Sequence, residues 1–337
     1  MSARPDVVER WSGVNAGQDE ARRLRLAGHA GDPAEVADAD AVSGTPLKFR
    51  VARRAPSRPH LQPRAVGEAV NAVAAAAAAV AEVDAPPHAA THQPRLRVDN
   101  VSLDYRVDRR SIRATHQVAF DVMPGERFVL LGASGCGKSS LLKAVGGFLP
   151  ASEGRILLDG QPISGPGPDR MAVFQEFDQL PPWKTVLDNV AFPLTASRKL
   201  DVAGARLHAQ DWLARVGLAG FAGAFPHQLS GGMKQRVAIA RALAMSPRML
   251  LMDEPFAALD ALTRRRMQEE LLALWEQERF TLLFVTHSIE EALHVGHRIL
   301  VLSPHPGRVR AEFNAQGLDG AQRLALGQRI EQLLLET

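Results

Sequence analysis

The stretch that decides the fold is Gly132-Ala133-Ser134-Gly135-Cys136-Gly137-Lys138-Ser139, which follows an apolar run at residues 128–131. It matches the pattern G-x-x-x-x-G-K-[ST], with an expected strand before it and an expected helix at 139–145 after it. Glycines let the backbone wrap around a phosphate with its N–H groups pointing inward, and the helix start adds positive potential. The sequence therefore predicts a phosphate-binding loop between a strand and a helix.

Individual side chains of this loop have predicted roles. Lys138 is expected to neutralise the β- and γ-phosphates, and the Ser139 hydroxyl is expected to bind Mg²⁺. Cys136 is expected to contribute its backbone rather than a redox thiol, since nothing nearby offers it a resolving partner. The predicted ATP-binding residues of the loop are Gly132, Ala133, Ser134, Gly135, Cys136, Gly137, Lys138, Ser139 and Ser140.

A second apolar run, at residues 249–252, ends in the adjacent carboxylates Asp253 and Glu254. Asp253 suits Mg²⁺ coordination, and Glu254 suits polarisation of an attacking water molecule. Successive side chains of a strand point in different directions, which separates the two roles. Together with the phosphate loop, this pair indicates an ATPase or GTPase.

The chain from residue 96 onward alternates short apolar runs with helical segments and Gly/Pro turns, which is typical of an α/β domain. Further runs at 282–285 and 299–302 are expected to be buried strands. The strands at 128–131, 249–252 and 282–285 each end at a polar cluster. A ligand site at the carboxyl ends of parallel strands requires this arrangement.

Composition restricts the class of protein. The 337 residues include 40 Lys+Arg, 37 Asp+Glu and one cysteine. This charge balance gives no reason to expect a nucleic-acid partner or a polybasic membrane contact, and a single cysteine fits a reducing compartment. The sequence shows neither a secretory h-region nor an apolar run of about 18 residues, so we expect any membrane crossing to come from another chain.

The predicted organisation has three parts. Residues 1–94 are rich in Ala, Arg, Pro and Asp and lack a sustained period, which predicts a low-complexity, mostly disordered extension. Residues 95–315 are expected to form the nucleotide-binding domain. Residues 316–337 are expected to form a C-terminal helix, whose amphipathic segment at 321–335 favours packing over a regulatory role.

The run Leu-Ser-Gly-Gly-Met-Lys-Gln-Arg at 229–236 resembles the signature motif of ABC-type ATPases. Other motifs of that family are present in their usual order along the chain: Tyr105 and Gln175 before this run, and Ala-Ala-Leu-Asp at 257–260 and His287 after it. The resemblance covers about residues 95–310. It implies a P-loop NTPase core with an antiparallel β subdomain and a helical subdomain at about 176–232.

The resemblance also implies roles for single residues. Tyr105 would stack on adenine, although an ordinary strand aromatic is the alternative. Gln175 would reach the γ-phosphate, Mg²⁺ or water, and His287 would hold the water and Glu254 in line. The segment 288–291 has a capping-box pattern that would fix the helix behind His287. The implied catalytic set is Glu254, His287 and Gln175, and the implied metal set is Ser139, Gln175 and Asp253.

A helix expected from Ser230 to about residue 243 presents its first N–H groups to an anion. The resemblance implies that this second anion site contacts the γ-phosphate held by a second copy of the chain, in a head-to-tail dimer that encloses two ATP molecules. The implied contacts in trans are Ser230, Gly231, Gly232 and Gln235. Asp260 would lie in the dimer-interface loop, which begins with Ala257 where the family usually has Ser or Gly.

A narrower resemblance lies in the runs at 165–170, 173–176, 180–190 and 303–308. They are similar to ATPase subunits of the nitrate/sulfonate/taurine group of bacterial importers. This implies a peripheral subunit at the cytoplasmic face of the inner membrane, with a membrane-spanning permease and, indirectly, a solute-binding protein as partners. Trp183 lies where the family docks a helix of the membrane subunit, and packing within the helical subdomain is the alternative. The solute itself cannot be read from this chain.

Two other function classes stay open. A non-transport ABC-type ATPase acting on nucleic acid or ribosomes would carry two ATPase domains or a long coiled-coil insertion, for which the chain has too few residues. A nucleotide-dependent interaction module with little turnover would have no need of Glu254 and His287.

Overall fold

The computed structural model describes residues 93–107, 110–175 and 179–336. By internal contacts the chain divides into Met1–His60 and Leu61–Thr337, and every described residue belongs to the second unit. The predicted extension at 1–94 lies outside the described residues except for its last two positions.

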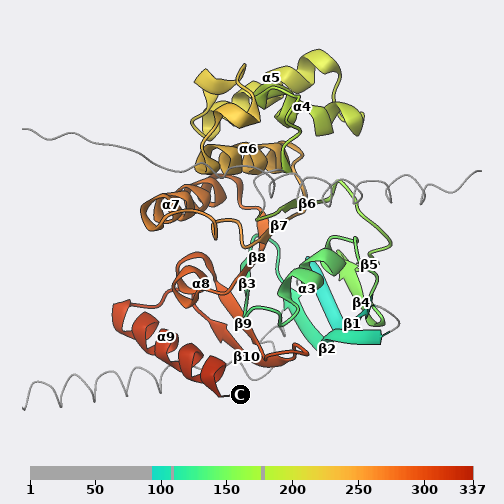
Figure 1. Cartoon of the computed structure of the whole chain (residues 1–337), viewed down its shortest axis with the longest axis vertical. Coiled ribbons are helices and arrows are strands. Elements are labelled where there is room, and N and C mark those ends of the chain that lie inside the picture. The colour runs from blue at the N-terminus through green and yellow to red at the C-terminus, as the bar shows by residue number, and fades with distance from the viewer. Residues whose placement is uncertain (1–92, 108–109, 176–178, 337) are drawn as a thin grey trace, which may run out of the picture. The chain divides into compact units, whose positions relative to one another are not determined.

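The centre of this unit is a six-stranded sheet in the order β10-β9-β3-β8-β7-β6 (Figure 1). Strands β9, β3, β8, β7 and β6 run parallel, and β10 pairs antiparallel with β9. Helices cover a parallel sheet on both faces, and its central strands are accordingly near-continuous apolar runs. The four strands predicted from the sequence are confirmed. The bounds are β3 (Arg127–Leu131), β6 (Arg170–Val173), β7 (Met249–Asp253), β8 (Thr281–Thr286), β9 (Arg298–Leu302) and β10 (Val309–Asn314).

A second, antiparallel sheet has the order β2-β1-β4-β5. Its strands are β1 (Leu96–Val107), β2 (Arg110–Val122), β4 (Glu153–Leu158) and β5 (Gln161–Pro162). Helix α3 (Lys138–Val145) belongs to the same hydrophobic core as β1, β2 and β3. The stacked rings of Phe120 and Phe128, with centroids 5.0 Å apart, join the two sheets. The predicted antiparallel β subdomain is confirmed.

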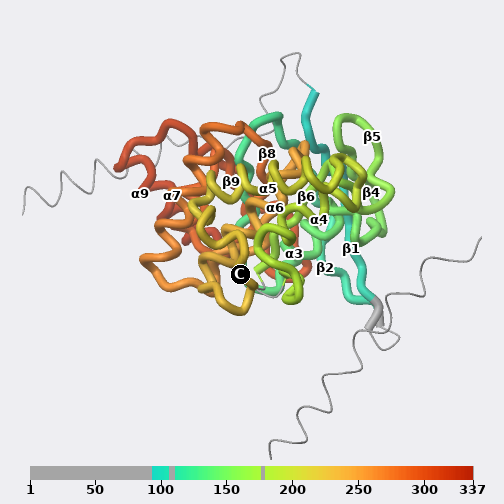
Figure 2. Tube along the Cα trace, turned by 90° about the horizontal axis from the view of Figure 1, so that it is seen from above, coloured from blue at the N-terminus to red at the C-terminus, as the bar shows by residue number. Residues whose placement is uncertain are grey.

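Three helices form a separate group at one end of the parallel sheet: α4 (Val186–Ala196), α5 (Val202–Arg215) and α6 (Gly231–Ala244). They pack on one another, and α6 contacts β6 (Figure 1). Figure 2 shows the same group from above, overlying the strands. Each helix begins at a side chain that caps its first turn, namely Thr185, Asp201 and Ser230. The helix expected from Ser230 to about 243 is therefore α6.

The remaining helices are α7 (Ala261–Glu278), α8 (Ile289–Val295) and α9 (Gly320–Leu335). Helix α9 matches the predicted C-terminal helix, and it packs against α8 with Ala325, Leu326 and Ile330 buried. None of the helices in the described ranges is both long enough and apolar enough to span a membrane.

Candidate active site

Three neighbouring parallel strands end at the same edge of the sheet. Leu131 at the end of β3 pairs with Thr286 at the end of β8, and Asp253 at the end of β7 pairs with Val285. The residues that follow are the loop at 132–139, His287 and Glu254. The register thus brings together the phosphate loop and the two catalytic candidates, as the strand assignment predicts.

The phosphate loop needs glycine at two positions. Gly135 and Gly137 have φ values of +81° and +93°, in the region that other residues adopt only at a cost. A Cβ on Gly137 would also lie 2.7 Å from the carbonyl oxygen of Ala114, because β2 lies directly against the loop. The thiol of Cys136 is 1 % exposed, and burial raises its pKa, so it is not a thiolate and fits the predicted backbone role.

Lys138 lies inside the loop with 4 % of its surface exposed. Its Nζ donates hydrogen bonds to the carbonyl oxygens of Gly132 at 2.9 Å and Ala133 at 3.0 Å. The same Nζ is 3.9 Å from Oε1 of Glu254. The positive charge therefore sits between the loop backbone and the carboxylate at the end of β7.

Two hard oxygen ligands lie side by side at the start of α3. The Ser139 hydroxyl donates to Oδ1 of Asp253 at 2.9 Å, and burial raises the pKa of the Asp253 carboxyl. One hydroxyl and one carboxylate beside a phosphate loop fit Mg²⁺, which takes oxygen ligands and is commonly held by one or two carboxylates together with substrate phosphates and water. Among the described residues no group of three or more His, Cys, Asp or Glu is placed to hold a metal ion.

Glu254 and His287 form a direct pair. Nδ1–H of His287 donates to Oε2 of Glu254 at 2.9 Å, in the tautomer that suits an ionised carboxylate. Glu254 has φ +45°, a strained value for a residue with a side chain, and its backbone N–H donates to the carbonyl of Val285 at 2.9 Å. The carboxylate is thereby fixed between Lys138 and His287. A general base with an orienting partner has this geometry.

The predicted capping box behind His287 is half formed. Ser288 accepts a hydrogen bond from the backbone N–H of Glu291 at 3.3 Å, as expected. The Glu291 carboxylate does not return to Ser288; it accepts from the Thr286 hydroxyl and from Nε2 of Gln268 on α7, the latter at 2.9 Å. The N–H of Ser288 donates to Thr286 Oγ1 instead, at 3.1 Å. The prediction was wrong in this half because the buried Glu291 carboxylate finds its partners across the helix interface.

Two predicted residues lie close to the site in the topology. Tyr105 on β1 is half-buried and pairs with Ile112 of β2. Two residues earlier on β1, Leu103 pairs with Thr115, and Thr115 lies beside the phosphate loop. Gln175 is exposed and follows β6, whose Val173 pairs with Met252 of β7. The adenine contact of Tyr105 and the nucleotide contacts of Gln175 stay predictions.

The first signature residues form the N-cap and the first turn of helix α6. Ser230 is exposed, and its hydroxyl accepts from the N–H of Met233 at 3.3 Å; Gly231 and Gly232 form the first turn. Gly232 is buried as well. Gln235 is 0 % exposed, and neither its Nε2 nor its Oε1 has a hydrogen-bond partner among the described residues. This placement does not offer Gln235 to a second chain, because the rest of α6 and its neighbours enclose the side chain.

Asp260 is exposed at the start of α7, where its carboxylate accepts from the N–H of Thr263 at 3.0 Å. This backbone hydrogen bond lowers the pKa of Asp260. The residue is therefore held as an ionised helix cap at the surface, which is compatible with its predicted place in an interface loop.

Two further residues make contacts near the site that no sequence pattern predicts. Arg241 on α6 donates to the carbonyl of Gln179 at 2.8 Å, and so joins the signature helix to the segment beyond Gln175. Gly307 lies against the phosphate loop: its N–H donates to Ala114 at 2.9 Å, and a Cβ there would be 2.0 Å from the carbonyl oxygen of Cys136. The run Pro-His-Pro-Gly at 304–307 indicates a tight turn, but sequence offers no sign of what the turn contacts.

Comparisons with known proteins identify ATP-binding proteins of transporters as similar to this chain. The family model described as "ABC transporter" matches residues 115–257. A taurine import ATP-binding protein, TauB, of Rhizobium johnstonii is 53 % identical over 232 residues, which cover 68 % of this chain and 86 % of the relative. TauB of Burkholderia thailandensis is 46 % identical over 240 residues, which cover 71 % and 90 % of the two chains.

Solved structures give the same result. The dimeric, post-hydrolysis structure of the ATP-binding cassette MJ0796 with ADP and Pi has a TM-score of 0.58 and 32 % identity, and covers 66 % of this chain and 100 % of that one. The structure of cbiO1 from Clostridium perfringens, part of the ABC transporter complex cbiONQ, has a TM-score of 0.60 and 28 % identity. The match covers 72 % of this chain and 95 % of cbiO1.

The fold and the site together define an ATPase built on a phosphate loop, with a helical group beside the catalytic sheet. The chain belongs to the ABC transporter family. The prediction of an ABC-type ATPase that resembles the nitrate/sulfonate/taurine group is confirmed.

Proposed function

We propose that this chain is the ATP-hydrolysing subunit of an importer for taurine or a related sulfonate, working as a head-to-tail dimer beneath a separate membrane subunit. The observation that carries the proposal is the Glu254 carboxylate, held 2.9 Å from His287 Nδ1 and 3.9 Å from Lys138 Nζ. The names of the TauB relatives support the solute class and the import direction. An importer subunit of this kind would be peripheral, at the cytoplasmic face of the inner membrane.

The chemistry follows from these three side chains. Lys138 neutralises the β- and γ-phosphates, and Glu254 accepts a proton from the water that attacks the γ-phosphorus in line. The bond from that phosphorus to the β–γ bridging oxygen breaks, which gives ADP and phosphate. His287 keeps the Glu254 carboxylate aimed at the water. A Mg²⁺ ion, which Ser139 and Asp253 would hold, supplies charge neutralisation on the phosphates when bound.

Support for the dimer comes from the two surface caps. Ser230 opens α6 and Asp260 opens α7, and both are exposed. A Cβ on Gly232 would lie 3.2 Å from Cγ2 of Thr263, so the first turns of the two helices are adjacent. The first turn of α6 forms a second anion-binding surface that suits the γ-phosphate on another copy, and Asp260 would lie beside it in the interface loop. Bound ATP would then close the dimer, and loss of the γ-phosphate would open it.

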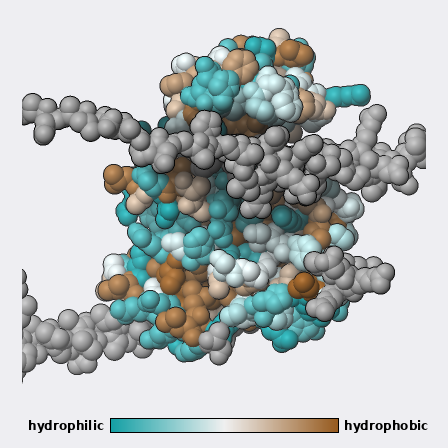
Figure 3. All heavy atoms as spheres, viewed as in Figure 1, coloured by the Kyte–Doolittle hydropathy of each residue, from teal (hydrophilic) through white to brown (hydrophobic). Residues whose placement is uncertain are grey.

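Support for a membrane partner comes from the helical group. Trp183 is 76 % exposed and Phe192 is 48 % exposed, which argues against the alternative that Trp183 packs within this group. Hydrophobic residues are visible between hydrophilic ones over the uppermost helices in Figure 3. Exposed aromatic side chains on a charged surface suit contact with a helix of another protein.

Uptake of labelled taurine tests the proposal in cells that carry this chain as their only copy. Cells with Glu254→Gln should lose ATP-dependent taurine uptake, whereas cells with Glu331→Gln, an exposed change on α9, should keep it. Parallel assays with nitrate and an alkanesulfonate decide the solute. Unchanged taurine uptake with Glu254→Gln would remove taurine from the proposal, and unchanged uptake of all three solutes would remove import of this solute group.

A further inference from the structure

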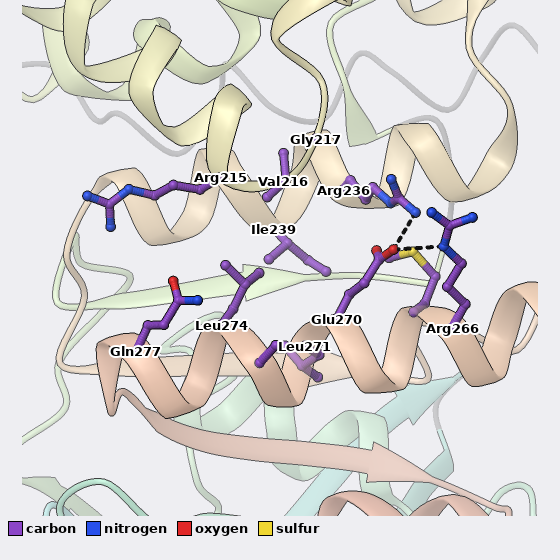
Figure 4. Close-up of a pocket in the computed structure, with 12 residues that line it drawn as sticks. Arg215, Val216, Gly217, Arg236, Ile239, Arg266, Glu270, Leu271, Leu274 and Gln277 are labelled. Atoms are coloured by element: carbon purple, nitrogen blue, oxygen red, sulfur yellow. Dashed lines mark hydrogen bonds and ion pairs between the residues drawn. The ribbon is translucent and has the colours of Figure 1, made fainter.

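A cavity of about 270 Å³ lies between the helical group and α7 (Figure 4). Its lining comes from the end of α5, from α6 and from the facing side of α7, and includes the apolar residues Ile239, Leu271 and Leu274. Helices that enclose a cavity lose the close contacts that normally fix their relative position. The polar contacts beside the cavity therefore contribute more to the relative position of α6 and α7.

One ion pair beside the cavity connects the two helices. Nη2 of Arg236 on α6 donates to Oε1 of Glu270 on α7 at 2.6 Å, and Nε of Arg266 donates to the same oxygen at 3.0 Å. Figure 4 shows both arginines converging on this carboxylate. The two contacts differ in kind, because Arg266 lies one turn away on α7 itself, whereas Arg236 comes from the other helix.

The two contacts also differ in how far their side chains are buried. The Arg266 side chain is 73 % exposed, the Arg236 side chain 19 % and the Glu270 side chain 33 %. An exposed pair within one helix contributes little, whereas a partly buried pair between two helices is less screened by solvent. The contact between Arg236 and Glu270 is thus the one that can fix α6 on α7.

The two helices it joins begin at Ser230, whose surface is assigned above to the partner's nucleotide, and at Asp260, which is placed above in the interface loop. The helices approach closely at their first turns, where a Cβ on Gly232 would lie 3.2 Å from Cγ2 of Thr263, and Arg236 contacts Glu270 further along both helices in the same direction. Buried residues of α6 and α7 also share one hydrophobic core. The contact between Arg236 and Glu270 adds a directional hydrogen bond to this packing, which helps to set the rotation of one helix against the other.

We propose that the pair of Arg236 and Glu270 is a positioning contact, which holds the loops at Ser230 and Asp260 in one fixed arrangement for the ATP of the partner subunit. This inference rests on the proposed dimer. The pair acts through α6 and α7, and the residues of the chain's own phosphate loop have their described contacts elsewhere, with β2, β7 and the loop itself.

The test compares four purified variants with the parent chain. Glu270→Gln and Arg236→Gln should each lower turnover at saturating ATP about fivefold, the effect of losing an interaction of ordinary ion-pair strength. The double variant should be no worse than either single one, because both remove the same contact. Arg266→Gln is the matched control, since it removes the other arginine from the same carboxylate, and it should stay within twofold of the parent.

A second readout separates positioning from general damage. In a Glu254→Gln background, Glu270→Gln should raise the protein concentration for ATP-dependent dimer formation about fivefold. Binding of a fluorescent ATP analogue to dilute, monomeric protein should be unchanged, as should the thermal midpoint within about 2 °C. Equal losses in Glu270→Gln and Arg266→Gln, or a loss that follows nucleotide affinity in the monomer, would overturn the inference. Failure of the proposed dimer would look different, because turnover of the parent chain itself would then be independent of its concentration.

Discussion

At the scale of one residue, the burial of Asp253, the expected Mg²⁺ ligand, lowers the stability of the folded chain. Burial raises the pKa of its carboxyl above the unfolded value, so the ionised form at neutral pH destabilises the folded chain. This cost is absent at low pH, where the carboxyl is protonated in both states, and it appears as the pH rises through the range between the unfolded and the raised folded pKa. The Ser139 hydroxyl offsets part of it.

We therefore expect Asp253→Asn to raise the thermal midpoint of the nucleotide-free protein at pH 7, on the order of 2 °C, while it abolishes Mg²⁺-dependent turnover. The gain should shrink as the pH falls through the raised pKa. Asp260→Asn is the control of opposite sign, because a backbone hydrogen bond lowers the pKa of Asp260, and it should give no gain. Thermal unfolding at several pH values decides this, and a lower midpoint for Asp253→Asn at pH 7 would contradict the account.

Gly307 gives a second prediction at this scale. A Cβ at this position would lie 2.0 Å from the Cys136 carbonyl oxygen, so alanine must push the phosphate loop out of place. Gly307→Ala should weaken ATP binding about tenfold, which corresponds to the 1–3 kcal/mol typical of overpacking. Gly320→Ala, where a Cβ would meet nothing within 4 Å, should bind ATP as the parent does. Equal affinities of the two variants, measured by titration, would show that the 304–307 turn does not support the loop.

Residues could be assigned from sequence where chemistry lies within one short run. Lys138 and Ser139 share the phosphate loop, and Asp253 and Glu254 follow one apolar strand, so their roles followed from local pattern. Gly307 and Arg241 could not be found this way, because each acts on a segment far away in the chain. Local pattern carries no information on such contacts.

At the scale of elements, buried hydrogen bonds directly behind His287 join α8 to α7 and to the end of β8. The Glu291 carboxylate is 6 % exposed and accepts from Thr286 and from Gln268. A buried polar group that loses its partner costs about 1–3 kcal/mol. The orientation of the residue after Thr286, His287, therefore depends on this small network.

Glu291→Ala should lower the free energy of unfolding by about 1–3 kcal/mol, because Thr286 and Gln268 lose their acceptor. Turnover should fall more than ATP binding does, since His287 loses its support while the phosphate loop keeps its contacts. The neighbouring Glu290→Ala, with a side chain 88 % exposed, should change stability by less than about 0.5 kcal/mol. Denaturant unfolding and steady-state kinetics give both quantities, and equal behaviour of the two variants would speak against the network.

Elements were more predictable than their partners. The four apolar runs gave β3, β7, β8 and β9 because a parallel sheet buried on both faces leaves a continuous signal. The capping box at 288–291 failed in part because a tertiary partner, Gln268, competes for the carboxylate. The burial of Gln235 could not be predicted from the sequence either. The signature motif shows which residue types are present but not which side of α6 is enclosed.

At the scale of the whole molecule, the exposed surface of the helical group should matter for coupling and not for stability. Trp183→Ala removes a side chain that is 76 % exposed, so the unfolding free energy should change by less than about 0.5 kcal/mol and turnover of the isolated chain should persist. Solute uptake in cells should fall at least fivefold, because a central aromatic contact typically carries 1 kcal/mol or more. The control is Leu207→Ala, which removes a different exposed apolar side chain, on α5. Equal uptake by both variants would exclude Trp183 as a docking residue.

The most direct test of the central claim is ATP turnover per subunit of the purified chain, measured against protein concentration. In the proposed dimer each site would need the Ser230 surface of a second copy, so we predict that turnover per subunit rises with concentration towards a plateau. It should vanish in Lys138→Ala and in Glu254→Gln, and the latter should still bind ATP and accumulate as a dimer on size-exclusion chromatography. Turnover that is independent of concentration, or a Glu254→Gln variant that stays monomeric and fully active, would contradict the composite site.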